Sequence, residues 1–330
     1  MSSERKIKYG LAINEALRSL MQSDPDVVLI GQGVKSPWYV GSTCLNLVRD
    51  FGEERVIDTP VSENAMTGAA VGAAMAGMKA IVVHPRVDFV LYAFDPIINQ
   101  AANFHYMSGG QMNVPVVFWL IVNRGGEQAA QHSQALHTMF AHVPGLKVVS
   151  PSNAYDAKGL MAAAINDPDP VVFIDDRWLY GTECHVPEEL YEVPIGKANV
   201  LKEGNDITLI SSSYTTKLSL NVAQQLESEN ISVEMIDLRS LKPYDKEALI
   251  RSAKKTGRVV VVDGSWRTAG YASEISAMLS EEVFSELKAP IARVTLPDTP
   301  APAARTLEAE FYITEENIRK SILDTINFKR

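Results

Sequence analysis

Short apolar runs, rich in β-branched residues, recur through the first half of the chain and are separated by segments with helical periodicity. The runs lack the polar–apolar alternation of a half-exposed strand, so both faces of each strand must be covered. Parallel strands joined by helices satisfy that requirement, and the sequence therefore predicts a doubly wound α/β domain. The expected strands are 26–30, 80–83, 115–122, 146–150 and 170–174, with helices near 11–22, 62–77, 92–107 and 154–166.

The alternation stops at residues 186–205, which contain two prolines and two glycines and show no sustained helical period. A second α/β alternation then begins with the apolar run at 206–211. A chain of 330 residues is long enough for two domains, each with its own core. We therefore expect a first domain at 1–185, a linker at 186–205 and a second domain at 206–330.

The charge and hydropathy of the chain exclude several classes of protein. A net charge of −9 argues against a nucleic-acid partner. The longest apolar run, residues 114–122, is too short to span a bilayer and contains Pro115. The two cysteines have no metal-ligand spacing, and the first ten residues lack the apolar core of a secretory signal. These features predict a soluble cytoplasmic protein without a membrane partner.

Glu63 is the one charged residue in the stretch "VSENAMTGAAVGAAMAGM", residues 61–78. An ordinary interpretation accounts for it: Ser62 caps a helix, and an acid in the first turn suits the helix dipole. The small residues that follow would let this helix pack tightly against any neighbour. The residues alone do not assign Glu63 a chemical role.

Three histidines, His132, His137 and His142, lie at spacings of five, which do not form a helical metal pair. His132 lies in a polar loop, where titratable residues often face ligands. The stretch "GQGVKS" (31–36) follows a strand, but Pro37 and Trp38 follow it where a dinucleotide-binding loop would start a helix. These residues indicate an α/β protein with polar groups at its strand ends.

Five motifs occur in order along the chain: "ERVIDTPVSENAMTGAAVGAAMAG", "QHSQ", "HVPGLKVVSPSNAYDAKGL", "INDPDPVVF" and "IDLRSLKPYD". Together they resemble one family. It is the β subunit of the thiamine-diphosphate-dependent decarboxylase component of the pyruvate and branched-chain 2-oxo acid dehydrogenases, within the transketolase-like superfamily. The resemblance covers residues 8–325 and implies a pyrimidine-binding domain followed by a transketolase C-terminal-like domain.

The resemblance assigns roles to individual residues. Glu63 falls on the glutamate that bonds a ring nitrogen of the cofactor's aminopyrimidine, where a shared proton favours the reactive tautomer. Phe89 falls where the family stacks an aromatic ring on the aminopyrimidine, and His132 where a histidine lies near the reacting centre. The resemblance also implies a structural potassium ion held by backbone carbonyls at Val116, Ala164, Ile165, Asp167 and Asp169.

The family binds the cofactor's diphosphate and its magnesium ion through a Gly-Asp-Gly motif, which this sequence lacks. In the family that motif belongs to an α subunit. The resemblance therefore implies an α2β2 heterotetramer in which this chain supplies half of each active site.

Some positions depart from the family pattern. Gln32 and Gly33 stand where the family commonly has two acids, Val83 where it often has Glu, and Trp119 where it has Arg. Replacing the arginine by Trp119 exchanges a cation for an apolar surface. These departures predict altered recognition of whatever accepts the acyl group.

The resemblance implies decarboxylation of a 2-oxo acid, pyruvate being the commonest, with transfer of the acyl group to a lipoyl acyltransferase core. One alternative is a carboligase that adds a two-carbon unit to a small acceptor such as an activated sugar. Another is a catalytically silent scaffold subunit.

Overall fold

The computed structural model describes residues 5–329 and divides into two compact units. The first comprises the chain up to Arg124 together with Met139–Ile195. The second comprises Gly125–Thr138 and the chain from Gly196 onward. The change of unit between Ile195 and Gly196 falls inside the expected linker, while Gly125–Thr138, expected in the first domain, groups with the second unit.

The first unit is built on a parallel sheet whose strands follow the order β6-β7-β5-β4-β2-β3. Every residue of the central strands β5 and β7 is buried, as the unbroken apolar runs predict. The strands are β2 (Val27–Gln32), β3 (Val56–Thr59), β4 (Lys79–His84), β5 (Val116–Val122), β6 (Lys147–Val149) and β7 (Val171–Asp176). The predicted doubly wound α/β class is confirmed.

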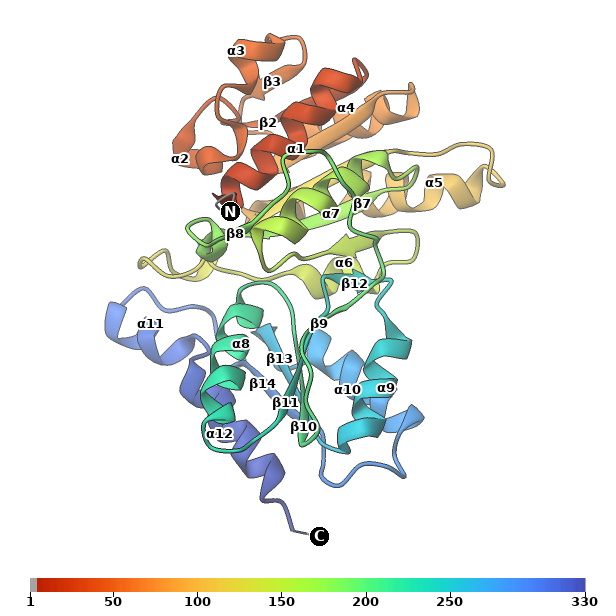
Figure 1. The fold of residues 1–330 in the computed structure, drawn as a ribbon. Helices are drawn as coiled ribbons and strands as arrows, with labels where there is room; N and C mark the ends of the chain where they lie inside the picture. Colours follow the sequence, from red (N-terminus) through yellow and green to blue (C-terminus); the bar gives the residue numbers. More distant parts are fainter. Residues whose placement is uncertain (1–4, 330) are drawn as a thin grey trace. The chain divides into compact units, whose positions relative to one another are not determined.

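Helices α1 (Tyr9–Ser23) and α7 (Ala154–Asn166) pack side by side across this sheet (Figure 1). Helix α4 (Glu63–Met75) packs against β4 and against the 3₁₀ segment η2 (Val87–Ala93). The shorter elements of this unit are β1 (Lys6–Lys8), α2 (Pro37–Val40), η1 (Gly41–Cys44), α3 (Leu47–Phe51), η5 (Arg177–Leu179) and β8 (Glu183–His185), and β1 pairs with β8.

The helix expected at 92–107 is not a single α-helix. The segment runs from η2 through a π-helix, η3 (Asp95–Ala101), into α5 (Ala102–Met107). Pro96 stands in the first turn of η3 and has no N–H to donate to the preceding turn. A π-helical turn inserted in a helix is unusual and often occurs beside functional sites.

The second unit contains a sheet of order β14-β13-β10-β11-β9. Helices α8 and α12 lie on one side of it and α9 and α10 on the other (Figure 1). The elements are β9 (Asn199–Lys202), β10 (Ile207–Ser211), α8 (Tyr214–Glu227), β11 (Val233–Asp237), β12 (Ser240–Lys242), α9 (Lys246–Thr256), β13 (Val259–Trp266), α10 (Tyr271–Glu282), β14 (Ala292–Leu296), α11 (Arg305–Phe311) and α12 (Glu315–Ile326).

Strand β9 lies within the segment expected to be linker. It pairs antiparallel with β11 at the edge of the sheet. Its four residues are only partly buried or exposed, so the strand lacks the apolar run that marks the other strands of the chain. A short edge strand of this kind leaves little signal in sequence.

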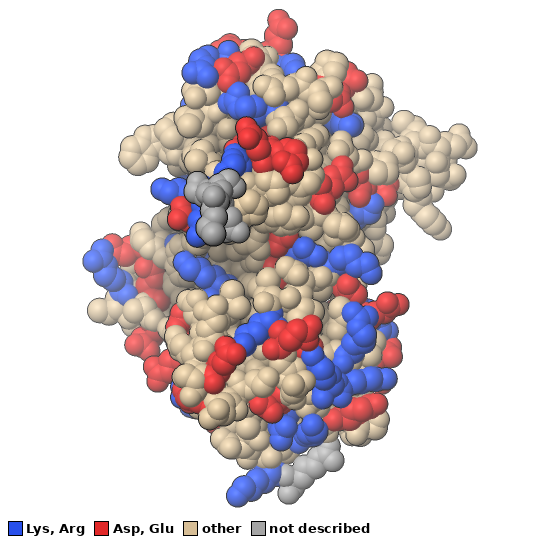
Figure 2. Space-filling model, viewed as in Figure 1, with Lys and Arg blue, Asp and Glu red and all other residues tan. Residues whose placement is uncertain are grey.

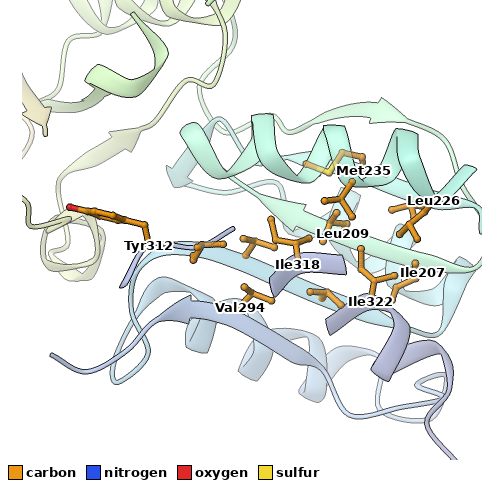
Figure 3. Packing of buried hydrophobic residues seen from close by; sticks show 14 of the residues in the cluster. Ile207, Leu209, Leu226, Met235, Val294, Tyr312, Ile318 and Ile322 are labelled. Carbon is orange, nitrogen blue, oxygen red and sulfur yellow. The ribbon is translucent and has the colours of Figure 1, made fainter. Parts of the chain in front are cut away.

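The core of the second unit lies between the sheet and helices α8 and α12 (Figure 3). Ile318 and Ile322 project from α12 onto strand residues such as Ile207 and Val294. The two isoleucines are four residues apart and therefore share one face of the helix. Burial of this face attaches the C-terminal helix to the sheet.

Acidic and basic side chains are interspersed on the face shown in Figure 2, without a large region of one sign. No helix among residues 5–329 is both long enough and apolar enough to cross a membrane.

Candidate active site

The carboxyl ends of the parallel strands in the first unit all meet at one edge of the sheet. Ligands of open α/β sheets bind at this edge, where the loops that follow the strands supply polar groups. Glu63 follows β3, Phe89 follows β4, and Asn123 and Arg124 follow β5. The edge therefore carries two of the residues singled out by sequence.

Glu63 is the first residue of α4 and is partly exposed. Ser62 occupies the N-cap position, but its side chain makes no capping hydrogen bond, so the predicted cap is absent. The Glu63 carbonyl accepts a hydrogen bond of 2.7 Å from Thr67 Oγ1. Its carboxylate has no hydrogen-bond partner within residues 5–329. An acid in the first turn, near the positive end of the helix dipole, is thus available to a ligand.

A buried histidine lies behind the first turn of α4. His84, the last residue of β4, has its Nε2 atom 3.0 Å from Thr67 Oγ1. Burial lowers the pKa of His84 to about 3, so the ring is neutral at physiological pH. Thr67 therefore connects the Glu63 carbonyl to an uncharged imidazole.

Phe89 lies in η2, the segment against which α4 packs, and is partly buried. Its backbone N–H donates to the Arg86 carbonyl at 3.3 Å. Glu63 and Phe89 thus lie on elements that are in contact within the first unit. The structure brings these two elements together although the residues are 26 positions apart.

His132 ends the short 3₁₀ segment η4 (Ala130–His132) and is partly exposed. It belongs to Gly125–Thr138, which is attached to the second unit by two main-chain contacts. The Gly125 N–H donates to the Tyr312 hydroxyl at 3.0 Å, and the Glu127 N–H to the Glu308 carboxylate at 3.2 and 3.3 Å. Both acceptors come from the C-terminal quarter of the chain, a link that the sequence does not show.

His137 begins α6 (His137–His142) and is a further attachment of the same segment. Its Nε2 atom lies 3.0 Å from Asp263 Oδ1, and both side chains are buried. Burial raises the pKa of Asp263, but the charge of His137 and hydrogen bonds from His137, Ser265 and the Ala272 N–H outweigh it, so the pKa is lowered. His137 is therefore paired with a carboxylate; residues 5–329 contain no His, Cys, Asp and Glu cluster able to hold a metal ion.

Trp119 is fully buried in β5, so the expectation that it offers an apolar surface to an acceptor is wrong. Its Nε1 donates to Asp175 Oδ2 at 3.0 Å, and the Tyr180 hydroxyl donates to the same oxygen at 2.6 Å. Burial raises the pKa of Asp175 to about 6 against the opposing effect of these two donors. The tryptophan thus supplies a neutral donor that suits this buried carboxyl group.

Arg124 and Asp176 form a second buried pair, with Arg124 Nε 2.8 Å from Asp176 Oδ2. The pair joins the loop two residues after β5 to the last residue of β7. Breaking a buried ion pair by removing one partner typically costs about 3–5 kcal/mol. This pair therefore holds the two strand ends in register.

The five residues assigned to a potassium ion lie around the C-terminus of α7 and the start of β5. Lys147 Nζ donates to both carboxylate oxygens of Asp167, at 2.6 and 2.8 Å, and to Asp169 at 3.3 Å. The lysine neutralises these side chains. A cation here would therefore be held by main-chain carbonyls, such as those at the end of α7, and not by these carboxylates.

The sequence motifs did not single out two arginines at the same sheet edge. Arg86 follows β4 by two residues, and Arg177 directly follows β7. Their position just after buried apolar runs was the available signal. A single arginine after a strand is too common to mark a site without knowledge of its neighbours.

Comparison with known proteins places the two units in one family. Residues 5–182 match the transketolase pyrimidine binding domain, and residues 196–318 match the transketolase C-terminal domain. A solved structure titled "Split gene transketolase, inactive beta4 tetramer" shares the fold, with a TM-score of 0.80 at 23% identity over 98% of this chain and 99% of that chain. The chain is thus a two-domain protein of the transketolase type.

Relatives along the full length define the family more closely. The chain is 43% identical to the β subunit of acetoin:2,6-dichlorophenolindophenol oxidoreductase from Cupriavidus necator, over 94% of each chain. It is 42% identical to the β subunit of the pyruvate dehydrogenase E1 component from Rickettsia conorii, over 94% of this chain and 97% of that one. It is 39% identical to the 2-oxoisovalerate dehydrogenase β subunit from Bacillus subtilis, over 98% and 99%. The chain belongs to the family of β subunits of thiamine-diphosphate-dependent 2-oxo acid dehydrogenases, as the sequence motifs predicted.

The neutral His84 predicts a pH dependence of folding stability. The folded-state pKa of about 3 lies below the ordinary value of 6.5, so the unfolded chain binds the extra proton between these pH values. The stability that comes from keeping this ring neutral is present above about pH 6.5 and is lost as the pH falls toward 3. Replacing His84 by Gln should remove this component from the pH profile of urea unfolding between pH 4 and 7.

Thr67→Val is the matched control, because it removes the hydroxyl beside the ring and keeps the histidine. It should lower stability at all pH values and retain the acid sensitivity. A His84→Gln profile parallel to that of wild type would contradict the assignment of a neutral buried ring.

Proposed function

We propose that this chain is the β subunit of an α2β2 decarboxylase that acts on a 2-oxo acid, with pyruvate as substrate. The observation that carries the proposal is the Glu63 carboxylate, which is partly exposed, without a hydrogen-bond partner in the described chain, and on a helix that contacts the segment bearing Phe89. An acid and an aromatic ring at the carboxyl edge of a parallel sheet suit a flat heteroaromatic ligand with a basic ring nitrogen.

Glu63 would share a proton with a ring nitrogen of the thiamine aminopyrimidine, and Phe89 would stack on that ring. When bound, thiamine diphosphate supplies the carbon nucleophile for decarboxylation. The role of Glu63 is to hold a proton at one atom so that the amino group on the far side of the ring can act as a base. His132 would orient the reactant or transfer a proton near the reacting carbon.

The remaining half of the site would come from an α subunit. This chain lacks the Gly-Asp-Gly motif that binds the diphosphate and its magnesium ion in the family. The named relatives are likewise β subunits of larger enzymes. The acyl group would pass to the lipoyl group of an acyltransferase core, which would be a further partner.

We also propose a structural potassium ion at the end of α7, held by the main-chain carbonyls of Val116, Ala164, Ile165, Asp167 and Asp169. The carbonyls at the C-terminus of a helix carry partial negative charge and lack intrahelical partners. Oxygen ligands of this type suit a hard cation.

The half-site model predicts that the isolated chain binds thiamine diphosphate poorly. In calorimetric titration with magnesium present, the isolated chain should give little heat, whereas the chain reconstituted with its α subunit should bind the cofactor tightly. The α subunit alone is the control. Tight, magnesium-dependent binding by the isolated chain would refute the shared site.

Glu63→Gln should retain the fold and slow the assembled enzyme, because an amide cannot share a proton with a ring nitrogen as a carboxyl group does. Carbon dioxide release from pyruvate with an artificial electron acceptor should fall by about 10²–10⁴-fold, the usual range for acid–base groups. Glu54→Gln is the control, because Glu54 is exposed and precedes β3. Activity of Glu63→Gln within about twofold of the control would contradict the role, given that range.

The potassium proposal predicts a higher melting temperature in potassium chloride than in sodium chloride at equal concentration. An ion that binds the folded chain alone stabilises it by mass action. Equal melting temperatures in the two salts, over a range of concentrations, would remove potassium from the proposal.

A further inference from the structure

Arg86 and Arg177 lie at the carboxyl edge of the first sheet, after β4 and β7, with only β5 between these strands. Strands separated by one neighbour are about 10 Å apart, so two extended arginine side chains can reach a common point. The turn after β2 links them further: Arg177 Nη1 donates to the Trp38 carbonyl at 3.4 Å, and Tyr39 interacts with Arg86. Both guanidinium groups thus adjoin the same short segment.

The Arg177 guanidinium has donors that the described chain does not satisfy. Its Nε and Nη2 atoms are buried and have no hydrogen-bond partner among residues 5–329. The Tyr180 ring lies 6.0 Å from its central carbon and offers a π face but no acceptor for these N–H groups. Buried donors without acceptors are rare in folded proteins and call for a partner.

The two arginines repel each other, and the acids near them are buried or engaged with other donors. Burial lowers the pKa of Arg86, and the positive charge of Arg177 lowers it further, while Asp88 and Tyr39 oppose the shift. Asp176, the carboxylate adjacent to Arg177 in sequence, is paired with Arg124. The charge of Arg177 acts on Asp175, but burial raises the pKa of Asp175 to about 6, and this carboxyl group already accepts from Trp119 and Tyr180. A negatively charged ligand would relieve the repulsion between the two guanidinium groups.

We propose that Arg86 and Arg177 form an oxyanion-binding pair that holds a carboxylate or phosphoryl group of a reactant beside Phe89. The inference rests on the proposed function for the position of the reacting centre, but the oxyanion site itself requires only this chain. A planar guanidinium presents parallel N–H donors that match two oxygens of a carboxylate or phosphate. The bound oxyanion is either the carboxylate of the 2-oxo acid or a phosphoryl group on the acceptor.

The first experiment measures binding of inorganic phosphate and of malonate to the full-length chain by calorimetry, without α subunit or cofactor. Arg86→Met and Arg177→Met should each weaken binding by about tenfold or more, the usual effect of losing a charge-assisted hydrogen bond. Arg86→Lys and Arg177→Lys keep the positive charge but lose the paired N–H donors of the guanidinium group. Their affinities for phosphate and malonate should lie between those of the wild type and the Met variants. Arg49→Met is the control, because Arg49 is exposed on α3 and paired with Asp50.

The second experiment distinguishes the two oxyanion sources in the reconstituted enzyme. If the pair holds the 2-oxo acid carboxylate, the Met variants should raise KM for pyruvate about tenfold and change kcat little, because ground-state binding is lost. If the pair holds a phosphoryl group, KM for pyruvate should stay unchanged and inhibition of acyl transfer by phosphate should disappear. Either result supports the pair.

Failure of the inference is separable from failure of the proposed function. Absence of phosphate and malonate binding to the chain, or binding equal in wild type and both Met variants, would overturn the oxyanion pair even if the enzyme decarboxylates pyruvate. Binding lost in the Met variants would support the pair even if pyruvate is not a substrate. Circular dichroism and melting curves of all variants, compared with Arg49→Met, confirm that each is folded.

Discussion

Burial of β5 between β4 and β7 is the constraint on which the first unit depends. Because all seven residues of β5 are inside the protein, polar chemistry can begin only where the strand ends. Three neighbouring strand ends then supply His84, the Arg124–Asp176 pair and Asp175 within one edge. The apolar centre of the sheet excludes water, and so it strengthens every electrostatic interaction at that edge.

The sequence predicted five strands of this sheet closely, because unbroken apolar runs have few other structural solutions. It missed β3, of whose four residues only Val56 is buried. It predicted helix α7 to the residue but missed the π-helical turn after Phe94, since π-helix formation depends on packing rather than on periodicity. Family resemblance alone assigned roles to Glu63 and Phe89; the residues by themselves gave Glu63 only a place in the first turn of a helix. The pairing of His137 with Asp263, 126 residues apart, has no local signal at all.

Several buried polar groups at this edge are matched by their neighbours. Trp119 is buried and donates to a carboxyl group whose pKa is raised to about 6. A neutral donor beside a carboxyl group that is easily protonated costs less than an unpaired charge in the core. Besides the paired Arg124, this edge carries Arg86 and Arg177, which follow the strands on either side of β5.

Because Gly125–Thr138 belongs to the second unit, no single cut in the sequence separates the two units. The polypeptide passes between units at Arg124, Thr138 and Ile195, so neither unit is a continuous stretch of sequence. A fragment ending at Ile195 would carry His132 without Tyr312, Glu308 and Asp263, the groups that attach its segment. Recombination near residue 195 would therefore replace the residues that attach the segment bearing His132. Each such exchange would change the surroundings of His132 as well as the C-terminal unit.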